Sequence, residues 1–438
     1  MIHIRALGEK TAWRATAPSI LLVINSFVWY IFAYAVFSTI VDGLETEKLG
    51  LFTTYYVSVA VSAILGAKFF PRARTKSLDL WPFMGAIATL LLATISSDGM
   101  LTNALLALFL GASIGIGLPS CLSHFADSTS VENRGFVGGI IWSIMGFTVL
   151  ILAFLVNMLG QWEIIAALTI WRLFGGIGFL ALNRKHAKPA TQKPPSYLTI
   201  IRKRQILLYL FPWIMFSIIN FAEMPILESV FGSESFVFGQ LLEWAFIGVF
   251  AIVGGIIADI AGRKRVVIAG FVMLGIEYAA MSALFNSPSP EALYMFLTLD
   301  GITWGLLFSV FFMALWGDLG ENHEKEKYYA LGGLPYLLSN FLYILIKPYA
   351  SDIPALAAFS FASFFLFMAV IPLMYAPETL PEKTMKSRDL KSYAEKALKK
   401  AQKEAEKSQK EQSDKAEKEE PEETPEDAEA RKLAEKYY

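Results

Sequence analysis

The chain has 438 residues, of which 55% are hydrophobic and 18% are charged, with a formal net charge of −1 and a mean hydropathy of +0.48. This composition excludes an ordinary soluble globular protein and predicts a multi-pass membrane protein, with the densest charge in a C-terminal tail. No nucleic-acid partner and no cofactor are expected.

Twelve apolar stretches follow one another along the chain. A hydrocarbon core roughly 30 Å thick needs about 20 apolar residues per helical crossing. Membrane β-strands would alternate apolar and polar residues, whereas these stretches are apolar on all sides, so we predict an all-α integral membrane fold. The predicted helices span 17–41, 50–70, 80–97, 101–123, 135–157, 162–183, 205–229, 236–258, 265–285, 291–317, 328–347 and 354–376.

The Lys and Arg residues between these stretches predict an orientation. With the N-terminus inside, the inner segments carry twenty Lys and Arg, against two outside, as the positive-inside rule requires. Both termini are then cytoplasmic, and we expect the cell membrane as the location. The predicted parts are an N-terminus (1–16), a six-helix bundle (17–183), a cytoplasmic linker (184–204), a second six-helix bundle (205–376) and a charged tail (377–438).

The two bundles repeat each other. With an offset of 189 residues, Gly66 falls on Gly255 and Arg74 falls on Arg263, and Asp127 matches Asp318 after a further slip of two residues. Such landmarks predict two pseudo-repeats of six helices each.

The loop after the eighth helix, GGIIADIAGRKR, carries an acid, a glycine and three bases. Asp259 ends the helix, Gly262 permits a tight turn, and Arg263 lies four residues from the acid, where it can pair with it. The carboxylate could also face the positive N-terminus of a neighbouring helix. The alternative is that the three bases only fix the orientation in the membrane. The pattern consists of Gly255, Asp259, Gly262, Arg263, Lys264 and Arg265.

This pattern resembles the cytoplasmic loop signature of the major facilitator superfamily. The resemblance covers residues 1 to about 380 and includes Glu132-Asn133-Arg134-Gly135 and Pro377-Glu378-Thr379. It implies alternating access, with Asp259 closing the cytoplasmic side against the fifth helix at Gly135 and favouring an outward-open state. It also implies gating roles for Arg74 and Arg134. The first copy of the signature has Phe70 at the acid position, which predicts a weak or absent tie between helices 2 and 11.

The same resemblance places helices 1, 2, 4, 5, 7, 8, 10 and 11 around a substrate cavity. Three acids fall on these helices, Glu223, Glu243 and Asp300, and a charge at the bilayer centre costs at least about 3 kcal/mol. Their depths let one layer hold all three, with Asn220 on the same helix face as Glu223. The alternative for Glu223 and Glu243 is a hydrated place near the membrane surface.

Other polar and aromatic residues complete the expected site. Trp304 lies one turn from Asp300, and Asn25 and Tyr34 would line the first-half wall. Glu277 and Arg172 lie on outer helices, where we expect structural pairing. The clustered acids favour proton coupling, because neighbouring carboxylates repel one another and one of them can then bind a proton. The alternative is that they bind a cationic substrate or Na⁺ directly.

The predicted function is a secondary active transporter of a small solute, acting as a monomer in the lipid bilayer. No metal-ligand or nucleophile constellation is apparent, so we expect no enzyme activity and no metal site. The alternative is a transporter-like sensor that signals through its tail. In that tail, 387–420 predicts a helix with a thin apolar stripe, followed by a disordered acidic end. The stripe could dock on a partner, or the helix could be fully solvated.

Overall fold

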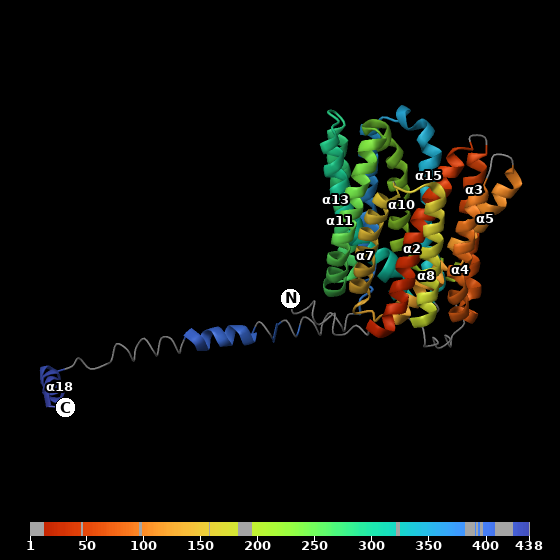
Figure 1. Ribbon diagram of the computed structural model, residues 1–438. Helices are drawn as coiled ribbons and strands as arrows, with labels where there is room; N and C mark the ends of the chain where they lie inside the picture. Colours follow the sequence, from red (N-terminus) through yellow and green to blue (C-terminus); the bar gives the residue numbers. More distant parts are fainter. Residues whose placement is uncertain are drawn as a thin grey trace. The chain divides into compact units, whose positions relative to one another are not determined.

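The structure is a computed structural model that describes residues 13–44, 47–95, 99–156, 158–182, 195–320, 325–381, 390, 393–394, 397–407 and 424–437. Every element assigned within these ranges is a helix, as predicted (Figure 1). The chain forms two compact units, Met1–Pro381 and Glu382–Tyr438.

The first half of the larger unit begins with a long apolar helix and continues through short turns. Its α-helices are α2 (Trp13–Asp42), α3 (Lys48–Phe69), α4 (Arg74–Leu91), α5 (Met100–Gly115), α6 (Leu118–Ser128), α7 (Arg134–Val156) and α8 (Gln161–Leu182). Two short helical turns, η1 (Phe70–Ala73) and η2 (Leu92–Thr94), lie before and after α4.

The second half follows a short connecting helix, α9 (Tyr197–Ile201). Its helices are α10 (Arg204–Phe231), α11 (Ser233–Ala261), α12 (Arg263–Leu284), α13 (Pro290–Phe308), η3 (Ser309–Leu315), α14 (Trp316–Leu319), α15 (Glu326–Ile346), η4 (Lys347–Asp352) and α16 (Ala355–Tyr375).

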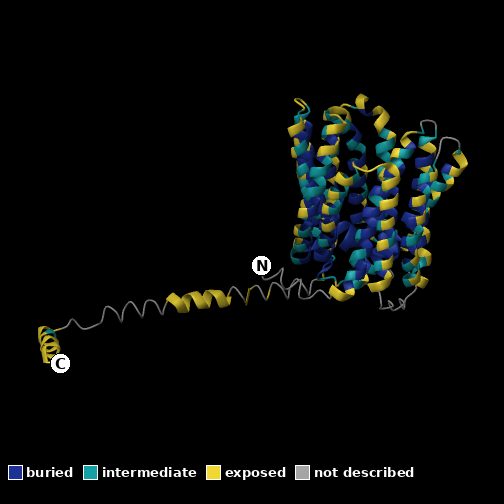
Figure 2. Cartoon of the chain, viewed as in Figure 1, coloured by how far each residue is buried: buried dark blue, intermediate teal, exposed yellow. Residues whose placement is uncertain are grey.

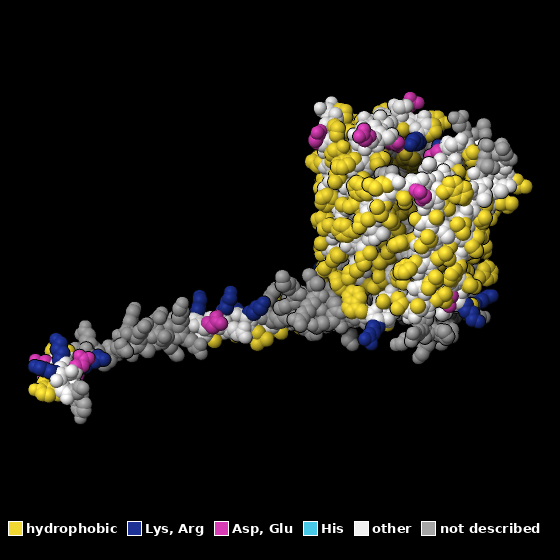
Figure 3. All heavy atoms as spheres, in the orientation of Figure 1, with side chains coloured by type: hydrophobic (Ala, Val, Ile, Leu, Met, Phe, Trp, Pro, Cys, Tyr) yellow, Lys and Arg dark blue, Asp and Glu magenta, His cyan; other side chains and the backbone are white. Residues whose placement is uncertain are grey.

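Eleven stretches of the described chain are long and apolar enough to cross a membrane. One of them, Lys48–Thr94, contains both α3 and α4 and so covers two of the predicted stretches. Large apolar side chains cover the outside of the larger unit (Figure 3), with Leu101 75% and Ile151 59% exposed. The buried residues lie on the helices toward the interior of the bundle (Figure 2). Such an apolar exterior is expected for a multi-pass membrane protein, which faces lipid.

The two halves meet where α7 packs against α11 and where α3 packs against α15. Glycines bring α7 and α11 close together: a Cβ on Gly255 would lie 2.1 Å from the Gly135 carbonyl oxygen, and one on Gly139 would lie 2.4 Å from the Ala251 oxygen. Small residues are what permit such close helix packing in membranes.

One turn of the tenth predicted crossing is not α-helical. The segment η3 has π-helical geometry, and the Tyr329 hydroxyl donates a hydrogen bond of 2.7 Å to the Met313 carbonyl within it. Such π-helical turns are frequent at functional sites, and this one packs against α7 of the other half, because a Cβ on Gly138 would lie 2.5 Å from Met313.

The smaller unit contains the helix α18 (Pro425–Tyr437). The described residues from 390 to 407 are helical, and the rest of the predicted helix 387–420 lies outside the described residues. The sequence analysis expected disorder at the end of the chain, and the described residues 425–437 form a helix. Proline at the first helical position and the Thr424 hydroxyl, which donates to Asp427 over 2.7 Å, favour a helix start there.

Candidate functional site

Asp259 joins the two halves at the end of the bundle that carries Arg74 and Arg263, called here the basic end. Its side chain is fully buried and accepts hydrogen bonds from the backbone nitrogens of Gly135 (3.0 Å) and Phe136 (2.6 Å), at the start of α7. A carboxylate at a helix N-terminus is favoured by the helix dipole. Arg263 pairs with the same carboxylate. The structure therefore places Asp259 where the sequence predicted it, between its own arginine and the fifth predicted crossing.

Asp318 extends this contact into a buried network. It pairs with Arg134, at the start of α7, and accepts from Arg263 Nε over 3.1 Å. Arg263 also donates to the Val131 carbonyl over 2.6 Å. All three charged side chains are at most 1% exposed. Hydrogen bonds between ionised groups are about twice as strong as neutral ones, so this network ties α14 and α12 to the other half.

Glu378 binds the backbone of the loop at the start of α12. Its carboxylate accepts from the backbone nitrogens of Arg263 (2.8 Å) and Lys264 (3.2 Å), which satisfies free donors at the start of α12. Gly262 has a φ of +107°, which favours glycine. Lys264 Nζ donates to the Met374 carbonyl over 2.7 Å, whereas Arg265 is exposed.

The first half carries a matching network, which the sequence analysis did not predict. Arg74 pairs with Asp127 within its own half and with Glu326 in the other half, each over 2.5 Å, and Lys325 pairs with Asp127 over 2.5 Å. A tie between α3 and α15 was predicted to be weak, because Phe70 replaces the acid. Glu326, in the first turn of α15, supplies a carboxylate from the opposite side of the interface.

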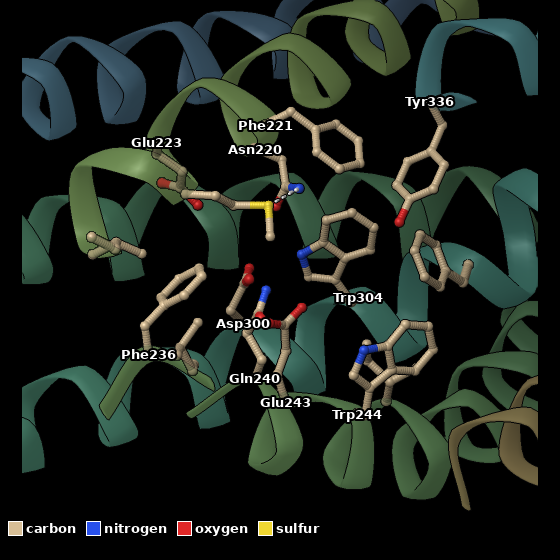
Figure 4. A pocket seen from close by; sticks show the side chains of 15 residues that line it. Asn220, Phe221, Glu223, Phe236, Gln240, Glu243, Trp244, Asp300, Trp304 and Tyr336 are labelled. Carbon is tan, nitrogen blue, oxygen red and sulfur yellow. Dashed lines mark hydrogen bonds between the residues drawn. The ribbon is translucent and has the colours of Figure 1, made fainter. Parts of the chain in front are cut away.

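The three predicted cavity acids line one small cavity in the second half (Figure 4). Glu223 lies eight residues before the end of α10 at Phe231, and Glu243 and Asp300 each lie ten residues after the starts of α11 at Ser233 and α13 at Pro290. At 1.5 Å per residue, these depths are about 12–15 Å. The acids therefore share one layer. The cavity volume is about 70 Å³.

Two of the carboxylates in this layer, those of Glu223 and Asp300, are buried with few partners. Glu223 is 5% and Asp300 is 2% exposed. Glu223 Oε2 and Asp300 Oδ1 accept no hydrogen bond from the described residues. A Cβ on Gly301 would lie 2.5 Å from the Glu243 carbonyl oxygen, so this glycine permits the close approach of α11 and α13 that brings Glu243 toward Asp300.

Glu277 belongs to the same group, although the sequence suggested a separate structural role on an outer helix. It is 4% exposed, its Oε2 accepts from Thr303 Oγ1 over 3.3 Å, and it interacts electrostatically with Asp300 and Glu223. Thr303 and Asp300 lie three residues apart on α13, on the face toward α12. Four carboxylates therefore come together from α10, α11, α12 and α13.

Aromatic side chains surround the acids. Trp304 lies beside Asp300, with its indole nitrogen toward that carboxylate (Figure 4). Its ring is 4.3 Å from that of Phe308, which is in turn 4.3 Å from Trp142 of the first half. Asn220 also lines the cavity, as predicted. The sequence analysis missed Gln240 and Tyr336, although Gln240 lies three residues before Glu243, on the same helix face.

Two residues expected in the cavity lie elsewhere. Asn25 donates to the Trp171 carbonyl over 2.6 Å and accepts from Arg172 over 2.8 Å, so it belongs to the packing between α2 and α8. Tyr34 accepts a hydrogen bond of 2.7 Å from the Tyr56 hydroxyl, within a group of tyrosine rings.

Arg172 is fully buried between two tryptophan rings. Its guanidinium lies 4.5 Å from the centre of the Trp29 ring and 4.4 Å from that of Trp81. It also donates to Asn25 and Ser26, each over 2.8 Å. Cation–π contacts of a desolvated guanidinium contribute about 2 kcal/mol or more. These contacts are those of a residue that packs α2, α4 and α8 together.

No family model matches the sequence, and no curated protein sequence matches it. Among solved structures, the chain is similar to the crystal structure of the human organic anion transporter MFSD10 (TETRAN). The TM-score is 0.61 at 13% sequence identity, covering 82% of this chain and 99% of that chain. At this identity the similarity concerns the fold. The chain therefore has the fold of a major facilitator superfamily transporter, as the loop signature predicted.

Proposed function

We propose that the protein is a secondary active transporter that moves a small solute across the cell membrane by alternating access between the bundles 17–183 and 205–376. The chain would cross the membrane twelve times, because Lys48–Thr94 holds two helices joined by the turn η1. The basic end and both termini would be cytoplasmic, as the excess of Lys and Arg at that end favours. The observation that best supports the proposal is the group of four carboxylates, three of them buried, within this fold.

The contacts at the basic end correspond to a closed cytoplasmic side. Asp259 binds the start of α7, Arg134 binds Asp318, and Arg74 binds Glu326. Each contact joins residues of different halves. An inward-open state requires that all three break, so we assign this structure to a state closed toward the cytoplasm.

Proton coupling follows from the carboxylate group. Asp300 interacts with Glu223, Glu243 and Glu277, and also with Tyr278 and Tyr336. Two like unit charges 4 Å apart repel by about 4 kcal/mol at an effective dielectric constant of 20. Protonation relieves this repulsion. Among the described residues, no group of three or more His, Cys, Asp or Glu side chains is placed to hold a metal ion.

Proteoliposomes test this function without knowledge of the solute. The purified full-length chain is given a defined mixture of amines, amino acids, carboxylates, sugars and nucleosides, and the vesicle contents are analysed by mass spectrometry after a pH gradient is imposed in either direction. We expect at least one solute to accumulate with the gradient and to be lost when a protonophore is added.

Two variants test whether the cavity acids are needed for transport. Asp300→Asn should abolish gradient-driven accumulation, whereas Glu228→Gln should retain it, because Glu228 lies on α10 outside the cavity and pairs with Lys347 over 3.0 Å. Binding of a solute without flux would instead support the sensor alternative.

A further inference from the structure

The charge of the cavity walls restricts what can bind there. Fifteen residues line the cavity, and among them Glu223, Glu243 and Asp300 are acids, while none is Lys, Arg or His. Figure 4 shows the oxygens of these three side chains turned toward one space. Glu223 Oε2 and Asp300 Oδ1, both on side chains at least nine-tenths buried, accept no hydrogen bond from the described residues. Buried carboxylate oxygens of this kind need a donor, which a ligand can supply.

The rest of the wall is aromatic. Trp244 and Trp304 line the cavity with four further rings, those of Phe221, Phe236, Phe308 and Tyr336. Aromatic faces attract cations through the ring quadrupole, and ammonium groups are the ligands that aromatic cages recognise. Carboxylates together with indole rings therefore favour an organic cation.

Two other ligand classes fit poorly. An anion would meet three carboxylates, two of them buried, without a cationic side chain among the described lining residues, so the repulsion would be uncompensated. The solute named for the human protein of the same fold is an organic anion, which makes this a difference between the two proteins. A metal ion is disfavoured because, among the described residues, no three His, Cys, Asp or Glu side chains are placed to coordinate one together.

The size of the cavity restricts the cation. A volume of about 70 Å³ is far below the roughly 300–1,000 Å³ of pockets for drug-sized ligands. By the same measure, a site for one water molecule needs about 10–15 Å³, so the cavity in this state has room for a compact group of a few heavy atoms.

We infer, on the basis of the transport function proposed above, that the solute is a small organic cation with one ammonium group. Its N–H groups are hydrogen-bonded by Asp300 and Glu223, and its positive charge faces the ring of Trp304. Glu243 completes the negative wall.

A matched series of three probes tests the inference on the full-length chain in detergent, by isothermal titration calorimetry. tert-Butylammonium, tert-butanol and pivalate share one tert-butyl group and differ in charge. We expect tert-butylammonium to bind at least about tenfold more tightly than either of the other two, as the loss of one hydrogen bond to a charged group predicts. Equal or tighter binding of the alcohol or of pivalate would overturn the inference, and this comparison uses the wild-type chain alone.

Variants locate the binding. Asp300→Asn and Glu223→Gln should each weaken tert-butylammonium binding about tenfold or more. Glu228→Gln, a matched change on the same helix as Glu223, should leave it within about twofold, because Glu228 lies outside the cavity and pairs with Lys347 instead. Size-exclusion chromatography checks that each variant is folded. Undiminished binding in both cavity variants would refute the assignment of the ligand to these carboxylates.

The vesicle assay separates the two proposals. If only neutral or anionic solutes accumulate with the pH gradient, the transport function stands and the cation assignment fails. If tert-butylammonium binds as expected but no solute accumulates, the cation site stands and the transport function fails.

Discussion

Asp259→Asn is the substitution that most directly probes the closure of the basic end. The Asp259 carboxylate accepts two hydrogen bonds from backbone nitrogens of α7, of 3.0 Å and 2.6 Å. Asparagine keeps one acceptor oxygen and presents an NH₂ group to the second nitrogen. The variant therefore loses one charge-assisted hydrogen bond, about 1.5–3 kcal/mol, and the interaction of a full charge with the α7 dipole, about 0.3–2 kcal/mol.

The combined loss is roughly 2–5 kcal/mol, which shifts the balance between closed and open basic ends by about 30-fold to several thousand-fold at about 1.4 kcal/mol per factor of ten. Arg263 retains Asp318 in the variant, so we expect the fold to survive. Transport should fall strongly while expression stays largely intact.

Electron spin resonance distance measurements can read this shift. The one cysteine, buried Cys121, is replaced by serine, and spin labels are attached at Lys76→Cys on α4 and Arg265→Cys on α12, both exposed at the basic end of different halves. We expect Asp259→Asn to add a population with a longer distance between the labels.

Asp42→Asn is the matched control, because Asp42 pairs with Lys48 over 2.5 Å in an exposed ion pair at the opposite end of the bundle. Exposed ion pairs contribute about 1 kcal/mol or less, so the label distances should not change. An Asp259→Asn variant that keeps the wild-type distance distribution and the wild-type transport rate would refute the role of Asp259 as a tie between the halves.

Three further predictions concern other contacts. Glu326→Gln should open the basic end in the same spin-label assay, and adding Phe70→Asp should restore closure in part by returning an acid to the α3 side; no effect of Glu326→Gln would contradict its role. Gly255→Ala should hinder closure, because the added Cβ would lie 2.1 Å from the Gly135 carbonyl, and a wild-type label distance would disprove this. Arg172→Met should lower the thermal unfolding midpoint in detergent, because it removes two cation–π contacts of the core; an unchanged midpoint would show that these contacts contribute little.

The sequence predicted the helices and the contact of Asp259 because both depend on patterns that are local in the chain. Apolar stretches of membrane length form helices whatever their neighbours are. The repeat and the loop signature placed Asp259 at the start of α7, where its carboxylate accepts from Phe136. The depth of a residue in the membrane also follows from local counting along its helix. These depths predicted that Glu223, Glu243 and Asp300 lie in one layer, and all three line one cavity.

The sequence did not predict contacts that depend on the rotation of each helix about its axis or on which helix packs against it. Glu326 was missed because aligning the two repeats compares only corresponding positions, and Phe70 corresponds to Asp259. The carboxylate that pairs with Arg74 comes instead from Glu326, on the other side of the interface. Glu277 was assigned to the outer scaffold because its helix lies outside the expected cavity, although its face is turned toward Asp300. Asn25 was placed in the cavity, but it faces Arg172. Both assignments failed because one sequence does not give the rotation of a helix about its axis.

Solute flux driven by a pH gradient tests the central claim most directly. Vesicles containing the wild-type chain should accumulate a solute when the gradient is imposed, release it when the gradient is reversed, and lose the effect with a protonophore or in Asp300→Asn. A folded, solute-binding protein that shows no flux with a gradient of either sign would contradict the account.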